Sequence, residues 1–315
     1  MTKRKANSER ERVGNGSGLR NPNIRFAVFG TSRIAVGILD ELERAGFVPE
    51  LVVAAPDAPK GRGMEVASPP TKAWAAARGI RVLQPEKFDS NILQNIGIDW
   101  SVFVVVDYGK ILPKEVLDIP KRGCLNVHFS LLPRYRGASP IRSAILNSDR
   151  NVGTSIILLV ERLDEGPIVA QKPIPLLSWP MKASELQDIC IRESGRLLAR
   201  ILPEWVAGRI EAREQNHDLA TYCEKIKKED GLLDLNADDA YKNLLKVRAY
   251  EGWPGTYAFF ERGGKKIRVG ILEAHLGGDP STSLGASRLV IDRVKPEGKR
   301  EISYEEFLRS GAKPI

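Results

Sequence analysis

In the first half of the chain, the pattern of apolar positions alternates between that of strands and that of helices. Residues 24–29 form an apolar run that ends at Gly30, which predicts a buried strand. The apolar residues of 35–42 then recur at helical spacing, and Gly46 stops that helix. Residues 51–55 are again apolar and predict a second strand. The chain therefore opens with a βαβ unit.

The same alternation continues to about residue 208. Further strands are expected at 80–83, 101–106, 124–128 and 154–160, with a helix near 71–78. Almost continuously apolar strands are typical of parallel strands that are buried on both faces. We therefore expect an α/β fold with a Rossmann-like, doubly wound and mainly parallel sheet. A long helix is expected to begin at Ser184, which has capping-box spacing to Gln187, and to close at Gly208.

After this helix the pattern changes to shorter elements. A helix at about 237–249 precedes short strands at 256–260 and 266–272, with a hairpin turn at Gly263 and Gly264. A strand at 288–294 and a small helix starting near Ser303 end the chain. These elements predict a smaller, β-rich C-terminal domain, a reduced OB-like barrel. The expected organisation is a disordered basic tail (1–22), a first domain (23–210), a linker (211–228) and a second domain (229–315).

The composition narrows the class of protein. At 42% hydrophobic and 28% charged residues, the 315-residue chain resembles an ordinary globular protein. No apolar run is long enough to span a bilayer, and the basic N-terminus lacks the apolar region of a signal peptide. The three cysteines are scattered and the chain has three histidines, so we expect a cytoplasmic protein with no membrane contact and no metal site.

The positive charge is concentrated at the two ends. The net charge is +8; residues 1–22 carry six Lys or Arg against two acids, and residues 225–315 carry seventeen against fourteen. This distribution favours a polyanionic partner that is approached from outside the central domain. The alternative is that the charge only aids solubility.

The turn between the first expected strand and helix argues against dinucleotide binding. Gly30 is the one glycine in the turn 29–33, whereas a dinucleotide fingerprint uses three to let the backbone approach a pyrophosphate. A Rossmann-like sheet that does not bind NAD is expected.

The strand at 124–128 carries the strongest chemical signal. Asn126 and His128 are two residues apart, so their side chains leave the same face, at the carboxyl end where open α/β sheets bind ligands. An amide donor beside an imidazole suits a carbonyl that becomes an oxyanion. The alternative is a core histidine. Asp164 stands in a turn after the next strand, where a carboxylate could set the protonation of an imidazole or only cap the turn.

A family resemblance accompanies these residues. The run Asn126-x-His128-x-Ser130-Leu131-Leu132-Pro133-x-Tyr135-Arg136-Gly137, followed by Asp164-x-Gly166, resembles the signature of folate-dependent formyltransferases. The resemblance implies an enzyme that uses 10-formyltetrahydrofolate as co-substrate, with no permanently bound cofactor and no metal. Asn126, His128 and Asp164 would be catalytic. Asn126 and an imidazolium of His128 would stabilise the oxyanion, while Asp164 would hold His128 charged.

Other segments resemble the branch of this family that formylates methionyl-tRNA. They are the loop Pro56-Asp57-x-Pro59-x-Gly61-Arg62-Gly63, the loop Tyr108-Gly109-x-Ile111-Leu112-Pro113, Trp253-Pro254-Gly255, and the ending around Lys299. The resemblance implies transfer of the formyl group to the α-amine of initiator methionyl-tRNA by a monomeric enzyme. The implied folate-binding residues are Tyr108, Gly109, Ile111, Ser130, Leu131, Leu132 and Pro133, and the implied tRNA contacts are Arg62, Lys265, Lys266 and Arg268.

The chain also departs from that branch. Met64 and Glu65 follow Gly63 where basic residues are usual, Asp107 replaces a small residue, and the connection 277–287 is short. Two other functions stay open: a sugar-nucleotide N-formyltransferase that would use the same three residues, and a non-catalytic nucleic-acid-binding or regulatory protein.

Overall fold

The computed structural model describes residues 24–60, 65–236, 239–278 and 288–315. The basic tail 1–22, the expected tRNA contact Arg62 and most of the short connection 277–287 lie outside these residues.

A seven-stranded sheet forms the centre of the first domain, with strand order β10-β9-β7-β6-β1-β2-β5. The strands are β1 (Phe26–Gly30), β2 (Leu51–Val53), β5 (Arg81–Leu83), β6 (Val102–Val106), β7 (Cys124–His128), β9 (Gly153–Leu158) and β10 (Ile168–Pro173). The five strands from β5 to β7 are parallel, while β9 and β10 are antiparallel to their neighbours. The expected Rossmann-like, mainly parallel sheet is confirmed.

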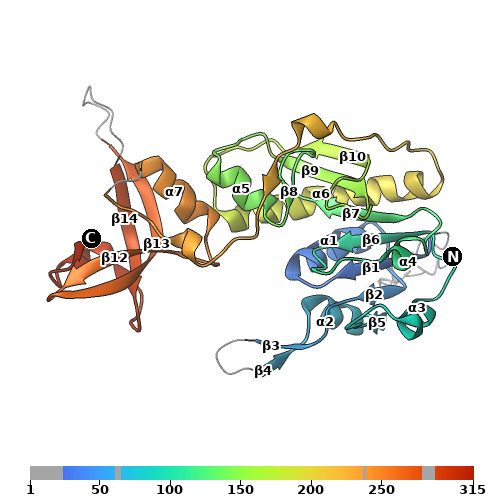
Figure 1. The fold of residues 1–315 in the computed structure, drawn as a ribbon, viewed down its shortest axis with the longest axis horizontal. Coiled ribbons are helices and arrows are strands. Elements are labelled where there is room, and N and C mark those ends of the chain that lie inside the picture. Colours follow the sequence, from blue (N-terminus) through green and yellow to red (C-terminus); the bar gives the residue numbers. More distant parts are fainter. Residues whose placement is uncertain (1–23, 61–64, 237–238, 279–287) are drawn as a thin grey trace, which may run out of the picture.

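Helices cover both faces of this sheet (Figure 1). One face packs against α1 (Arg33–Arg44), α2 (Pro70–Ala76) and α6 (Ala183–Val206), and the other packs against α3 (Ser90–Ile96) and α4 (Lys114–Leu117). Val104 faces the first layer and Phe103 the second, and both are fully buried. Because the residues of the central strands are buried on one side or the other, β1, β2 and β6 are apolar throughout.

The start of α6 differs from the expected capping box. The N-cap is Lys182, two residues before Ser184, so the helix begins at Ala183, and the Glu185 carboxylate accepts the backbone N–H of Lys182 at 3.0 Å. Ser184 instead donates its hydroxyl to Glu251, which follows α7 (Ala240–Ala249), at 2.6 Å. The predicted capping box was wrong because the Ser184 hydroxyl is hydrogen-bonded to the second domain and does not cap the helix. Gly208 follows the helix with a φ of 76°, as expected of a helix-stopping glycine.

The second domain is built on an antiparallel sheet with strand order β15-β14-β13-β12-β16. Its strands are β12 (Thr256–Arg262), β13 (Lys265–Gly277), β14 (Arg288–Pro296), β15 (Ile302–Ser303) and β16 (Lys313–Pro314), and α8 (Tyr304–Leu308) joins the last two. Gly263 and Gly264 form the hairpin turn with φ values of 58° and 73°. Phe260, Val269 and Phe307 lie in the centre of its core. The expected β-rich domain is confirmed.

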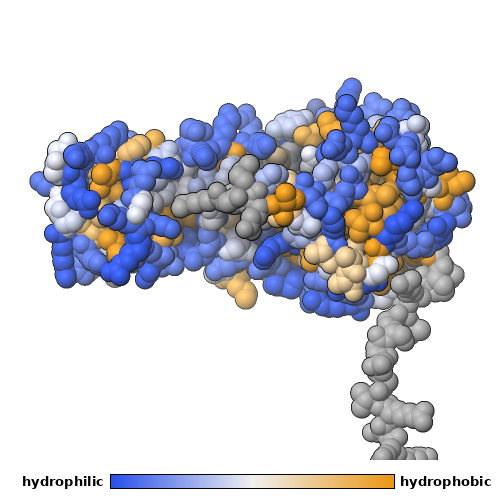
Figure 2. Space-filling view, turned by 90° about the horizontal axis from the view of Figure 1, so that it is seen from below, coloured by the Kyte–Doolittle hydropathy of each residue, from blue (hydrophilic) through white to orange (hydrophobic). Residues whose placement is uncertain are grey.

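The two domains meet where α7 packs on α5 (Pro140–Leu146) (Figure 1). Leu245, Ala249 and Tyr250 share one apolar core with Ile141 and Ile145 of the first domain. The molecule is elongated, and the face in Figure 2 is largely hydrophilic with small apolar patches.

The segment expected to be a linker follows the first domain closely. It contains β11 (Tyr222–Cys223), which pairs with β8 (Arg136–Gly137), and a 3-10 turn at His217–Leu219. A second 3-10 turn at Glu229–Gly231 leads into the second domain. The remaining strands, β3 (Ala58–Lys60) and β4 (Glu65–Ala67), form a separate hairpin. In the part of the chain that the structure describes, no helix is long and apolar enough to cross a membrane.

Candidate active site

The carboxyl end of β7 carries Asn126 and His128, as the sequence predicts. Both side chains line a cavity of about 530 Å³ that also reaches Asp164. The His128 side chain is buried, and its backbone carbonyl accepts the Thr154 hydroxyl of β9 at 3.2 Å. The strand therefore fixes two polar side chains on one face at a single edge of the sheet.

Asp164 reaches the same point from the turn between β9 and β10. Its backbone has a φ of 53°, and its side chain is buried. One carboxylate oxygen, Oδ2, accepts the Gly137 N–H at 2.8 Å and lies 3.6 Å from His128 Nδ1. The other, Oδ1, accepts the Asn126 amide at 3.4 Å. The structure therefore brings Asn126, His128 and Asp164 together.

The hydrogen bonds of His128 decide which tautomer its neutral form adopts. Nε2 lies 2.9 Å from the Tyr135 carbonyl oxygen, which can only accept, so Nε2 carries the proton and Nδ1 faces Asp164 without one. Burial lowers the pKa of His128, and the Asp164 charge opposes this effect only in part. Before substrates bind, the neutral imidazole is favoured, rather than the imidazolium that the family resemblance implies.

One wall of the cavity is the loop after β6. Tyr108, Gly109 and Ile111, three of the expected folate-binding residues, line it. Ile111 is exposed, whereas the Tyr108 hydroxyl is buried without a hydrogen-bond partner among the described residues. Burial raises the pKa of Tyr108 to about 12, so the hydroxyl keeps its proton and can donate a hydrogen bond to a ligand.

The other expected folate-binding residues, Ser130, Leu131, Leu132 and Pro133, do not line this cavity. Their polar backbone groups are used within the fold. Ser155 donates its hydroxyl to the Ser130 carbonyl at 2.7 Å and accepts the Leu132 N–H at 3.1 Å. Gln171 donates to the Leu132 carbonyl at 2.9 Å. The loop thus anchors the end of β7 on β9 and β10.

The expected tRNA contacts lie on β13, in the second domain. Lys265, Lys266 and Arg268 are exposed. The Lys266 ammonium lies 4.1 Å from the ring centre of Phe259, and the Arg268 guanidinium lies 3.7 Å from that of Tyr257. Both distances are those of cation–π contacts. Arg62 is outside the described residues.

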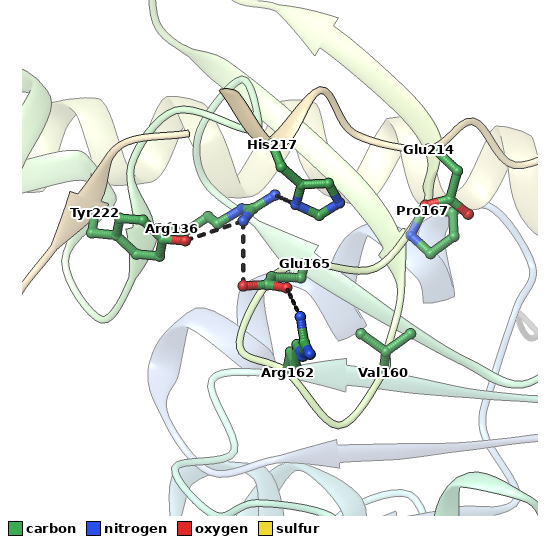
Figure 3. Close-up of a pocket in the computed structure, with 8 residues that line it drawn as sticks. All are labelled: Arg136, Val160, Arg162, Glu165, Pro167, Glu214, His217 and Tyr222. Carbon is green, nitrogen blue, oxygen red and sulfur yellow. Dashed lines mark hydrogen bonds and ion pairs between the residues drawn. The ribbon is translucent and has the colours of Figure 1, made fainter. Parts of the chain in front are cut away.

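Sequence reasoning missed the network behind Asp164. Gln215 donates its amide to the backbone carbonyls of Asp164 and Gly166, both at 2.7 Å, and accepts two hydrogen bonds from Arg136. Figure 3 shows the Arg136 guanidinium between His217, Tyr222 and Glu165. The Arg136 side chain is 1% exposed. Gln215 lies in a polar segment without periodicity, so no local sequence signal marks it.

This arrangement can perform direct acyl transfer between two substrates. An amide donor, an imidazole and a carboxylate converge on one end of the cavity, where they can stabilise an oxyanion and carry a proton. Among the described residues, no group of three or more His, Cys, Asp or Glu side chains is placed to hold a metal ion.

The chain matches known formyltransferases in sequence. Residues 23–201 match the family model described as formyl transferase. The chain is 36% identical over 308 residues to a methionyl-tRNA formyltransferase of Herpetosiphon aurantiacus, covering 93% of this chain and 99% of the relative. It is 38% identical over 295 residues to that of Thermotoga maritima, covering 90% and 91%.

A solved structure shares the fold at lower sequence identity. An N-formyltransferase from Helicobacter canadensis, in complex with folinic acid and dTDP-3-aminofucose, superimposes with a TM-score of 0.60 and 17% identity. The likeness covers 82% of this chain and 90% of that one. The match of the family model, together with relatives that align over almost the entire chain, shows that the chain belongs to the formyl transferase family.

Proposed function

We propose that this protein transfers the formyl group of 10-formyltetrahydrofolate to the α-amine of methionyl-tRNA. The observation that carries the proposal is the convergence of Asn126, His128 and Asp164 at the end of one cavity, in a chain that aligns over its length with methionyl-tRNA formyltransferases. The folate would bind along the wall made by Tyr108, Gly109 and Ile111.

The reaction begins when the amine nitrogen attacks the formyl carbon. The C=O bond opens, and the oxygen takes a negative charge. The Asn126 amide donates one N–H to Asp164 at 3.4 Å, and its side chain can turn so that an N–H donates to that oxygen. In the second half of the reaction the bond between the formyl carbon and the folate nitrogen breaks, and that nitrogen takes a proton.

His128 and Asp164 would carry the proton between these steps. Since Nδ1 of neutral His128 has a free lone pair, it can accept the proton that leaves the attacking amine. The resulting imidazolium lies beside the Asp164 carboxylate, 3.6 Å away, which stabilises its charge. The imidazolium then donates the proton to the departing folate nitrogen. Burial, which lowers the pKa of His128, makes this last donation easier.

The second domain would hold the body of the tRNA. Lys265, Lys266 and Arg268 present positive charge on β13, and phosphate contacts of this kind give affinity without reading sequence. The tail 1–22 carries six basic residues against two acids and could add further phosphate contacts.

A transfer assay with several acceptors tests the proposal. The purified protein is mixed with 10-formyltetrahydrofolate that is labelled in the formyl group, and each amine acceptor is supplied separately. We expect label on methionyl-tRNA and little on a dTDP-amino sugar. Label on the amino sugar but not on the tRNA would leave the family assignment intact and overturn the acceptor. Label on neither acceptor would overturn the proposal.

A further inference from the structure

Arg142, on α5, is an arginine of the cavity wall without a partner. It lies in the first turn of the helix, is half-buried, and lines the cavity that contains Asn126, His128 and Asp164. It makes no hydrogen bond, ion pair or ring contact with any described residue, and its Nε is buried without an acceptor. A guanidinium has five N–H donors and stays charged in proteins.

Three nearby arginines have partners, whereas Arg248 on α7 is, like Arg142, half-buried with an Nε unsatisfied among the described residues but does not line this cavity. Arg134 pairs with Asp149, Arg136 is bonded on all sides, and Arg162, on the same cavity, lies 3.7 Å from Glu165. Removing a guanidinium from water without an acceptor is costly, and here burial lowers the pKa of Arg142. An unpaired cation in a substrate cavity suggests that a ligand supplies the acceptor.

The position of Arg142 in the cavity indicates which substrate it would contact. Its helix packs on α7, and Tyr250, which follows α7, shares one apolar core with Ile141, the residue before Arg142. The loop that contains Tyr108 leads into α4, which Figure 1 places well away from α5. Arg142 therefore belongs to the part of the cavity wall that α5 contributes, next to the second domain, whereas residues 107–112 contribute a different part.

We propose that Arg142 binds the phosphate of the nucleotide that carries the amino acid, and so positions the α-amine toward His128 and Asp164. This inference rests on the proposed function. In an aminoacyl ester the amino acid is attached to the ribose whose 5′ oxygen bears the phosphate, so the anion lies one nucleoside away from the reacting amine. The planar guanidinium can bind two phosphate oxygens at once.

Small acceptors isolate this contact. 2′(3′)-O-methionyl-AMP and 2′(3′)-O-methionyl-adenosine differ only in the phosphate. With the unchanged protein, the acceptor that carries the phosphate should have a kcat/KM at least about tenfold higher, the scale of one charge-assisted hydrogen bond. Arg142→Gln should remove this preference, and Arg142→Lys should keep part of it. If turnover is too slow, the same comparison is made by competitive inhibition of methionyl-tRNA formylation.

Methionyl-tRNA and the folate give the second readout. Arg142→Gln should raise the KM for methionyl-tRNA about tenfold or more and leave the KM for 10-formyltetrahydrofolate unchanged. Arg200→Gln, which removes an exposed charge from α6, is the matched control and should change neither value. The variant Arg142→Gln should melt at or above the temperature of the unchanged protein, because an unpaired half-buried charge is lost.

Three results would overturn the inference. Arg142→Gln could retain the preference for the phosphate, raise the KM of the folate alone, or lower the melting temperature by several degrees. The second would assign the arginine to the carboxylates of the folate, and the third to the fold. Failure of the unchanged protein to formylate methionyl-tRNA is a different outcome, which overturns the proposed function itself.

Discussion

The side-chain amide of Gln215 donates to the backbone carbonyl of Asp164 at 2.7 Å. The same nitrogen donates to the Gly166 carbonyl, while the amide oxygen accepts from Nε and Nη2 of Arg136 at 3.2 and 2.8 Å. All four hydrogen bonds that a primary amide can form are made, so its orientation is fixed. Gln215 thereby holds both carbonyls of a turn whose Asp164 has a positive φ of 53°.

We expect Gln215→Ala to lower kcat by about tenfold or more, because loss of the amide lets the Asp164 carboxylate move, and small displacements at a reacting centre are costly. The KM of the folate should change little. Glu214→Ala, at the exposed neighbouring position, is the control. Steady-state kinetics of both variants provide the measurement. Equal losses in the two variants, or a loss confined to KM, would contradict a positioning role for Gln215.

Replacing either His128 or Asp164, the proposed proton carriers, should abolish most turnover while the fold survives. His128→Asn and Asp164→Asn should each lower the rate of formyl transfer by at least about 10²-fold, the usual scale for acid–base groups. The amide oxygen introduced by Asp164→Asn can still accept the Gly137 N–H that Asp164 accepts at 2.8 Å, so the local structure should persist. Single-turnover kinetics measure the effect, with circular dichroism as the folding control. A variant that is folded and nearly fully active would remove its residue from the mechanism.

His128 should also make stability depend on pH. Burial lowers its pKa in the folded protein, whereas in the unfolded chain the group has its ordinary pKa near 6.5. Below about pH 6.5 the unfolded chain therefore binds more protons, and the free energy of unfolding falls as pH falls, by at most about 1.4 kcal/mol per pH unit. Above that pH the contribution of His128 is fully present.

Urea unfolding at pH 7.5 and 5.5 tests this dependence. The unchanged protein should lose more stability between the two values than His128→Asn does. His217 and His275 are exposed and remain in both proteins, so the difference isolates His128. An identical loss in the two proteins would mean that the folded state does not favour neutral His128.

The cations of β13 should make the affinity for tRNA depend on the salt concentration. Arg268→Gln should lower the magnitude of the slope of log affinity against log salt by roughly 0.7 to 0.9 if the guanidinium neutralises one phosphate. Arg309→Gln removes a charge of the same domain that is ion-paired with Glu305, and it should leave the slope unchanged. Binding is measured with methionyl-tRNA between about 50 and 200 mM salt. A slope that is equal in all three proteins would exclude Arg268 as a phosphate contact.

The three cysteines should be inert while the protein is folded. All are free and buried, and burial raises the pKa of Cys124 and of Cys190 to about 12. The pKa of Cys223 is raised as well, again chiefly by burial. Since the thiolate is the reactive form, a thiol reagent at pH 8 should label the native protein very slowly and label three thiols in urea. Rapid labelling of one native thiol would show that its site opens.

The helices and strands of the first domain could be read from the sequence because their patterns are local. The apolar strands 101–106 and 124–128 appear as β6 and β7, and the stop at Gly208 follows the end of α6. The capping of α6 could not be predicted, because Ser184 bonds to Glu251 from the other domain. A contact between residues 67 apart has no local signal.

The sequence by itself determined the fold class and the family of this protein, together with the spacing that puts Asn126 and His128 on one face of a strand. These follow from periodicity and from one short motif. The tertiary structure decided which groups share the cavity: it added Arg142, left Ser130–Pro133 off the wall, and attached Gln215 to the Asp164 turn. It also decided that His128 rests as a neutral imidazole, because only the packing of distant segments around the side chain removes it from water.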